Sequence, residues 1–304
     1  MADTGPMDHA QSAAGRQRDR LLAAMTLSVG ILFAELAAGV VSHSLALLAD
    51  AAHVFADISG MALALAAIWI ANRPTSGART YGLYRAEILA AGLNAVLLLA
   101  VSAVVMWEGI QRLMAPSEVG TELMVAVAAL ALVANLGSLA LLRRGQAESI
   151  TLRGAYLEVL GDAAGAATVL AAGIVIALTG LRGADGLAAI AIGALILPRT
   201  GRLLRDSIDV LLEATPKGVH LDEVRAHMLE APDVEAVHDL HVWTITSGMN
   251  VVSAHIVMSP DANPGALLDH LGECLSGDFD IGHSTFQLET PEHVLWEGRA
   301  QPQR

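Results

Sequence analysis

The stretch Leu45–Ala71, LALLADAAHVFADISGMALALAAIWIA, is apolar and long enough to cross a bilayer as a helix, yet it contains two Asp and one His. His53 and Asp57 are four residues apart, so both side chains would project from one helix face. Ionisable groups inside a membrane are costly unless a partner offsets their charge. A divalent metal ion would supply that offset, and a His–Asp hydrogen bond that serves only packing is the alternative.

A second pair with the same spacing, Glu158 and Asp162, lies in the apolar stretch Ala155–Leu178. Alone it could be a charge pair beside Arg153, but with the first pair it completes the four ligands that zinc-like ions prefer. Asp50, three residues before His53, is a candidate second-shell carboxylate. Three more polar residues in apolar stretches either line an ion path or, as we favour, hydrogen-bond between helices: Glu35, Asn94 and Asn135.

The composition is that of a membrane protein. Of the 304 residues, 54% are hydrophobic but only 4% aromatic, so Ala, Leu, Val and Ile supply the apolar character. The single cysteine, Cys274, excludes a disulfide framework and a Cys-rich zinc module. We predict six spanning helices, the last ending at or shortly after Pro198: Leu21–Val41, Leu45–Ala71, within Tyr81–Met114, Leu123–Leu142, Ala155–Leu178 and within Leu187–Leu204.

The basic residues predict the orientation of these helices. Twelve arginines up to Arg205 flank the helices on one side, whereas Arg112 and Arg182 lie on the other. Positive residues mark the cytoplasmic side. We therefore expect a multi-pass protein of the cell (inner) membrane with both termini cytoplasmic and the first helix retained rather than cleaved.

The last third of the chain changes character. From Asp206 onward there are 17 acidic and 4 basic residues, which account for the whole net charge of −13. An acidic surface attracts cations and repels nucleic acid, so no nucleic-acid partner is expected. The residue pattern predicts a cytoplasmic α+β domain in the order α-β-β-α-β, with a helix at Leu221–Glu230, strands at Ala236–Ile245 and Val251–Met258, a helix at Asp261–Leu275 and a strand at Ser284–Leu288.

The predicted organisation is thus a polytopic α-helical membrane protein with a soluble C-terminal domain. Its parts are a cytoplasmic N-terminal tail (1–20), a six-helix transmembrane domain (21–205), a cytoplasmic C-terminal domain (206–296) and a tail (297–304).

Five stretches together resemble the cation diffusion facilitator family, in particular its bacterial cobalt–zinc–cadmium efflux subgroup. They are SLALLADAAHVFAD (44–57), RTYGLYRAEILAAGLNA (79–95), GAYLEVLGDAAG (154–165), LPRTGRLLRDSIDVLLE (197–213) and VHDLHVW (237–243). The resemblance runs from about Arg16 to about Pro291 and implies that the soluble domain is metallochaperone-like.

The resemblance also assigns residues. It implies a transport site of His53, Asp57, Glu158 and Asp162. The zinc-selective pattern has His where this chain has Glu158, and the extra carboxylate should admit cobalt or cadmium beside zinc. In the soluble domain it implies a regulatory metal site at His238, His255, His283 and Glu289. We favour this interpretation over the alternative that these are ordinary solvated residues. It further implies a charge pair between Arg85 and Glu213.

The function expected from this resemblance is proton-coupled efflux of divalent transition metals from the cytoplasm by a homodimer. Zinc, with cobalt and cadmium, would be the cargo, and no cofactor is expected. A membrane metal sensor or scaffold that does not transport is the alternative. An intramembrane metalloprotease would need a motif such as HExxH, which the sequence lacks, so we do not expect an enzyme.

Overall fold

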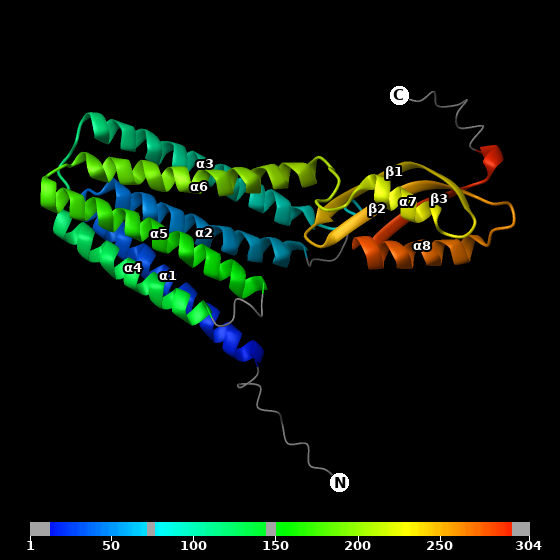
Figure 1. Cartoon of the computed structure of the whole chain (residues 1–304), viewed down its shortest axis with the longest axis horizontal. Helices are drawn as coiled ribbons and strands as arrows, with labels where there is room; N and C mark the ends of the chain where they lie inside the picture. Colours follow the sequence, from blue (N-terminus) through cyan, green and yellow to red (C-terminus); the bar gives the residue numbers. More distant parts are fainter. Residues whose placement is uncertain (1–12, 72–76, 144–149, 294–304) are drawn as a thin grey trace, which may run out of the picture. The chain divides into compact units, whose positions relative to one another are not determined.

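A computed structural model describes residues 13–71, 77–143 and 150–293. Six of the helices in these ranges are long and apolar enough to cross a membrane, which confirms the predicted number. They are α1 (Ala13–Ser42), α2 (Leu45–Ala71), α3 (Arg85–Met114), α4 (Thr121–Arg143), α5 (Ile150–Thr179) and α6 (Gly183–Leu211) (Figure 1). The chain divides into two compact units, 1–62 with 93–202 and 63–92 with 203–304.

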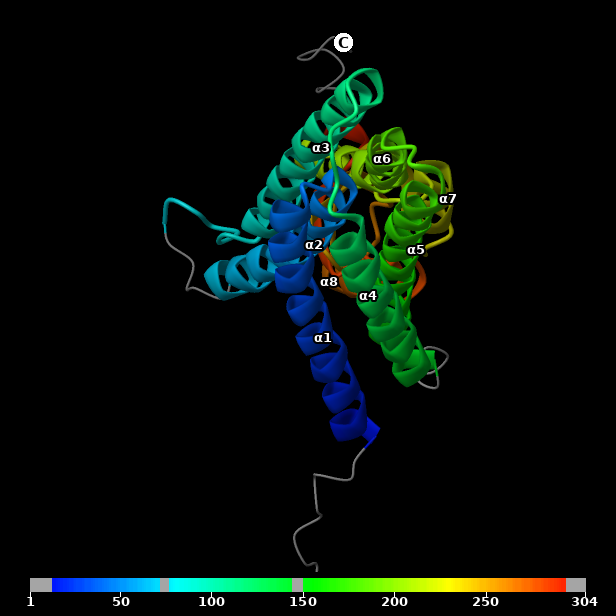
Figure 2. The ribbon, with the colours of Figure 1, turned by 90° about the vertical axis from the view of Figure 1, so that its left-hand side faces the viewer.

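The first unit contains most of the spanning helices. In it α1 lies against α4, and α4 against α5 (Figure 2). Small residues fill the helix contacts, and Ala46, Ala128 and Ala166 are fully buried. Large apolar side chains point outward instead, as at Phe33 and Leu178. Small residues let helix backbones approach closely in lipid, where outward apolar side chains carry no penalty.

Helix α6 corrects one prediction. We expected the sixth helix to end at or shortly after Pro198, but it continues to Leu211 with this proline inside it. Proline removes one backbone donor and leaves the carbonyl of Ala194, four residues earlier, without its helical partner. Spanning helices tolerate such a gap when neighbouring groups satisfy the freed carbonyl. Arg199 therefore lies on a continuous helix and not in a tail.

Glycines bring α3 and α6 into close contact. A Cβ atom at Gly186 would lie 2.7 Å from the carbonyl oxygen of Gly109, and one at Gly193 would lie 2.7 Å from Cγ of Met106. A larger residue at Gly186 would therefore push the two backbones apart. This contact fixes α6 beside α3 near the start of α6.

The N-terminus of α2 is held by a residue from another helix. Asp185, fully buried in the first turn of α6, accepts hydrogen bonds from the backbone N–H groups of Leu45 and Ala46 at 2.8 and 3.1 Å. Its carboxylate also accepts from Ser44 Oγ at 2.6 Å and from Arg112 of α3 at 2.8 Å. Anions at a helix N-terminus satisfy its free N–H groups. Asp185 thus fixes the helix that carries His53 and Asp57.

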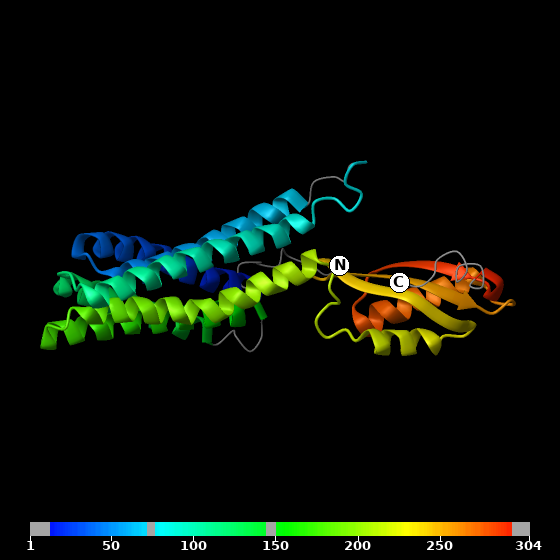
Figure 3. The same cartoon turned by 90° about the horizontal axis from the view of Figure 1, so that it is seen from above.

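The second unit contains the α+β domain in the predicted order: α7 (Leu221–Leu229), β1 (Val234–Thr246), β2 (Met249–Met258), α8 (Pro264–Phe279) and β3 (His283–Glu289). Strand β2 is central, antiparallel to β1 and parallel to β3. Both helices cover one face of the sheet (Figure 3). Met228, Ile256 and Leu271 are fully buried in that core.

Candidate functional site

Three of the four predicted membrane ligands lie together. His53 and Asp57 on α2 and Asp162 on α5 offer ligand atoms that all lie within 4.8 Å of one another. His53 Nε2 is 3.9 Å from Asp57 Oδ2 and 3.8 Å from Asp162 Oδ1. The four-residue spacing places both α2 side chains on one face, as predicted, and α5 supplies the third from across the helix contact.

The polar atoms of this group are buried and lack hydrogen-bond partners. Within the described residues, His53 Nδ1, Asp57 Oδ2 and Asp162 Oδ1 accept or donate no hydrogen bond. Buried polar atoms are normally paired, because leaving one unpaired costs about 1–3 kcal/mol. A His nitrogen and two carboxylate oxygens are a donor set suited to zinc-like ions. The chemistry of the group therefore fits a divalent transition metal.

The fourth predicted ligand, Glu158, points elsewhere. Its Oε1 accepts a hydrogen bond from Arg199 Nη2 at 2.9 Å, and the side chain is 38% exposed. Arg199 Nη1 also lies 3.9 Å from Asp57 Oδ2. The sequence interpretation missed Arg199, because it ended the sixth helix near Pro198 and grouped this arginine with the cytoplasmic basic residues. A helix continued through Pro198 would have placed Arg199 beside the site.

A cavity of about 400 Å³ gives access to the group. Asp57, Glu158 and Asp162 line it, together with residues from α1, α2 and α5. Its lining extends to Ala24 and Gly154, near the ends of α1 and α5 that we predict to be cytoplasmic. The cavity therefore lies between the acidic group and that end of the two helices.

Two other carboxylates are buried near the site. Glu35 and Asp50 are each 1% exposed, and Glu35 Oε2 and Asp50 Oδ1 have no hydrogen-bond partner among the described residues. A Cβ atom at Gly165 of α5 would collide with the Asp50 carboxylate, so only glycine fits there. Asn94 and Asn135 are also buried, and Asn94 lies against Gly60. The second-shell role of Asp50 remains a prediction.

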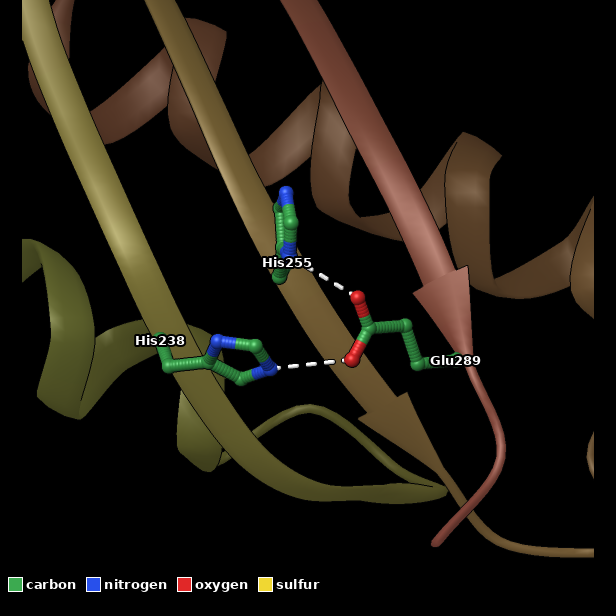
Figure 4. A group of neighbouring side chains, drawn as sticks. All are labelled: His238, His255 and Glu289. Atoms are coloured by element: carbon green, nitrogen blue, oxygen red, sulfur yellow. Dashed lines mark hydrogen bonds and ion pairs between the residues drawn. The ribbon is translucent and has the colours of Figure 1, made fainter. Parts of the chain in front are cut away.

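A second group of potential metal ligands lies on the sheet of the soluble domain. His238 on β1 faces its cross-strand partner His255 on β2, and Glu289 ends the adjacent β3 (Figure 4). His238 Nε2 lies 3.0 Å from Glu289 Oε2, and His255 Nδ1 lies 2.8 Å from Glu289 Oε1. The ligand atoms of the three residues lie within 4.8 Å of one another, which suits a metal ion.

The environment of Glu289 favours its ionised form. Burial alone would raise the pKa of this carboxyl, but hydrogen bonds from Gln287 and His238 and the charges of His238 and His255 outweigh burial and lower the pKa below its ordinary value. Gln287 Nε2 donates to Glu289 Oε1 at 2.6 Å. Glu289 can therefore offer an ionised carboxylate to a metal ion.

The sequence interpretation missed Asp239, which follows His238. The pairing of β1 with β2 is irregular between His238 and His241, and Asp239 has a positive φ of 48° there. A bulge re-aims a side chain out of the regular alternation. As a result Asp239 Oδ1 lies 3.0 Å from His241 Nε2, and Asp239 Oδ2 lies 3.7 Å from His255 Nε2.

His283 does not join the group on the sheet. The parallel register pairs it with Val251 at the opposite end of β3 from Glu289, and its ring packs edge-on against Tyr81 at 5.9 Å. Its assignment as a ligand remains a prediction.

The predicted charge pair and the single cysteine both lie in the second unit. Arg85 and Glu213 form the predicted ion pair, with 2.8 Å between Nη2 and Oε1. Cys274 is partly buried and donates to the carbonyl of Leu271, and burial raises the pKa of its thiol. This thiol is therefore less readily ionised than that of a fully solvated cysteine.

Two family models together match most of the chain. A family model described as "Cation efflux transmembrane domain" matches residues 21–212, and one described as "Cation efflux protein, cytoplasmic domain" matches residues 216–291. The solved metal-bound C-terminal domain of the CzcD transporter from Cuprividus metallidurans is 40% identical, covering 23% of this chain and 99% of its own, with a TM-score of 0.23.

Full-length relatives are similar over nearly the entire sequence. The metal cation efflux system protein CzcD of Cupriavidus metallidurans is 42% identical over 92% of this chain and 89% of its own. The zinc transporter ZitB of Escherichia coli is 36% identical (89% and 87%), and the cadmium, cobalt and zinc/H(+)-K(+) antiporter of Bacillus subtilis is 31% identical (95% and 96%). The chain is therefore a multi-pass membrane protein that belongs to the cation efflux, or cation diffusion facilitator, family.

Proposed function

We propose that this protein exports divalent transition-metal cations from the cytoplasm in exchange for protons. The observation that carries the proposal is the group of His53, Asp57 and Asp162, whose ligand atoms converge and in which buried Asp57 Oδ2 and Asp162 Oδ1 have no hydrogen-bond partner among the described residues. The names of the relatives support zinc, cobalt and cadmium as cargo. Glu158 would join these residues as the fourth ligand when Arg199 releases it.

Proton exchange follows from the chemistry of the ligands. Imidazole nitrogen and carboxylate oxygen bind either a proton or a metal ion, so metal binding expels protons and protonation expels metal. A protein that alternates the group between the two sides of the membrane would therefore couple the two flows in opposite directions. The antiporter name of the Bacillus subtilis relative is consistent with this coupling.

The arrangement in the cell is part of the proposal. The arginine bias supports both termini on the cytoplasmic side of the inner membrane, with a transmembrane domain over 21–205 and a cytoplasmic domain over 206–296. His238, His255 and Glu289 would bind a regulatory metal ion there, and the soluble domains would pair in a homodimer. The cavity beside Asp57 would then open toward the cytoplasm to load metal.

Counterflow of labelled zinc in proteoliposomes tests transport directly. The wild-type chain should exchange labelled zinc across the membrane, whereas Asp162→Ala should abolish exchange, because it removes a carboxylate that metal binding requires. Asp209→Ala is the control, because the ion pair of this residue with Arg205 is exposed and contributes little, and it should keep wild-type exchange.

Zinc binding without exchange by the wild-type chain would favour the sensor alternative. Normal exchange by Asp162→Ala would refute the assignment of the transport site.

A further inference from the structure

Arg199 is the nearest fixed positive charge to the transport group in the described residues. It projects from α6 toward two carboxylates on different helices, at 2.9 Å from Glu158 Oε1 and 3.9 Å from Asp57 Oδ2. The neighbouring Arg202 takes no part, because its Nε donates to the backbone carbonyl of Pro198. The orientation of Arg199 is therefore specific to the acidic group.

The charges of the site balance when Arg199 is included. Ionised Asp57, Glu158 and Asp162 carry three negative charges, and the guanidinium of Arg199 carries one positive charge. The resulting charge of −2 is equal and opposite to that of a divalent cation. A cation attracted to these carboxylates must therefore compete with the guanidinium, which already occupies Glu158. Glu158 adds a negative charge, and Arg199 offsets it.

We propose that Arg199 is a positioning residue that competes with the metal ion for Glu158. The guanidinium holds Glu158 away from His53, Asp57 and Asp162, and a bound cation draws Glu158 into its coordination shell only by displacing Arg199. When the cation leaves, Arg199 recaptures Glu158. The competition weakens binding and hastens release, which a transporter needs and a storage site does not. This inference rests on the proposed function.

A purely structural ion pair would behave differently. Glu158 is 38% and Arg199 56% exposed, and exposed pairs contribute little to stability. Loss of such a pair would leave metal affinity unchanged. Loss of a competitor would tighten metal binding and slow release without lowering the unfolding midpoint.

The test is Arg199→Gln in the full-length chain, with zinc as the probe. Zinc affinity is measured by calorimetry on detergent-solubilised protein, and KM and maximal rate are measured in proteoliposomes. We expect the zinc Kd and KM to fall about tenfold or more, because the competitor for Glu158 is removed. A tenfold lower Kd corresponds to about 1.4 kcal/mol of binding free energy. The maximal rate should be several-fold lower, because zinc is released more slowly. Arg202→Gln is the matched control and should change none of these values. A Kd that stays within twofold of wild type, or rises, would overturn the proposal.

A double-mutant cycle identifies the residue through which Arg199 acts. In a Glu158→Gln background, Arg199→Gln should change the zinc Kd by less than twofold, because the competed carboxylate is gone. A full tenfold effect in that background would refute the role of Glu158. The calorimetric readout is independent of transport, so a chain that binds zinc without moving it would refute the proposed function and still test Arg199. The unfolding midpoint of each variant reports whether it folds.

Discussion

Glu158 and Asp162 lie one helical turn apart on α5, yet only Asp162 lies beside His53. Their four-residue spacing predicted that both side chains lie on one face of α5. It could not predict which residues of other helices they contact, because spacing describes a single helix. The partner that turns Glu158 away, Arg199, comes from α6 and depends on how the helices pack. The residues of the membrane group were therefore predictable from the sequence, whereas the contact of Glu158 with Arg199 was not.

Metal preference at the residue scale should depend on Glu158. Glu158→His should shift the ratio of zinc to cobalt and cadmium flux toward zinc, because imidazole replaces a harder carboxylate. The single substitution leaves Arg199 beside the site without its closest partner, so the shift should be larger with Arg199→Gln added. Competition assays with the three metals in proteoliposomes measure both variants. An unchanged flux ratio in both would contradict this account of selectivity.

Gly165 should tolerate no side chain. Gly165→Ala would place a methyl group against the buried Asp50 carboxylate, and overpacking of this kind costs about 1–3 kcal/mol. We expect a lower unfolding midpoint and slower zinc flux. Gly161→Ala, four residues earlier on α5, is the matched control, because a Cβ atom there meets nothing within 4 Å. Equal midpoints for the two variants would contradict the close contact.

At the scale of elements, α2 shows what a local pattern can and cannot predict. Its bounds, Leu45–Ala71, agree with the prediction, because apolar length and flanking polar residues are local features. The group that caps it, Asp185, lies in another helix and gave no local signal. In the sheet of the soluble domain, too, only the local features were predictable. The facing of His238 and His255 followed from the predicted hairpin, whereas Glu289 reaches them only through the parallel register of β2 and β3.

The contact of Asp185 with α2 should be among the strongest single contributions to stability. Asp185→Ala leaves Arg112 without its carboxylate partner and the first N–H groups of α2 without acceptors. Removing one partner of a buried ion pair costs about 3–5 kcal/mol. Unfolding of the full chain in mixed micelles measures this loss. Glu118→Ala breaks the exposed pair with Arg182 and should cost less than about 1 kcal/mol. Similar losses in the two variants would argue against the contact.

At the scale of the whole molecule, composition predicted most of the architecture. Six apolar stretches became six spanning helices, and the change of pattern after Asp206 became an α+β domain. The predicted end of α6 at or shortly after Pro198 was wrong, because proline commonly ends helices in soluble proteins but is tolerated inside spanning helices. The start of α5 at Ile150, inside a predicted polar linker, was missed because polar residues can continue a helix beyond the bilayer.

The proposed orientation can be tested in whole cells. With Cys274→Ser as background, Glu118→Cys should react with a membrane-impermeant maleimide from outside, since residue 118 is exposed in the turn between α3 and α4. Arg79→Cys, between α2 and α3, should react only after the membrane is permeabilised. The positive-inside bias is the physical reason. The reverse labelling pattern would invert the proposed direction of export.

The hydrogen bond between Ser44 and Asp185 joins residues 141 positions apart in the chain. A ribosome makes Ser44 long before Asp185, so the first two amide groups of the second helix, those of Leu45 and Ala46, must bind water until Asp185 is made. Those groups find their acceptor only when the last spanning helix arrives. The N-terminus of α2 therefore reaches its final hydrogen bonding only after α6, the last spanning helix, has been made. Nascent chains that stop before residue 183 should remain loosely assembled and open to proteolysis near Ser44.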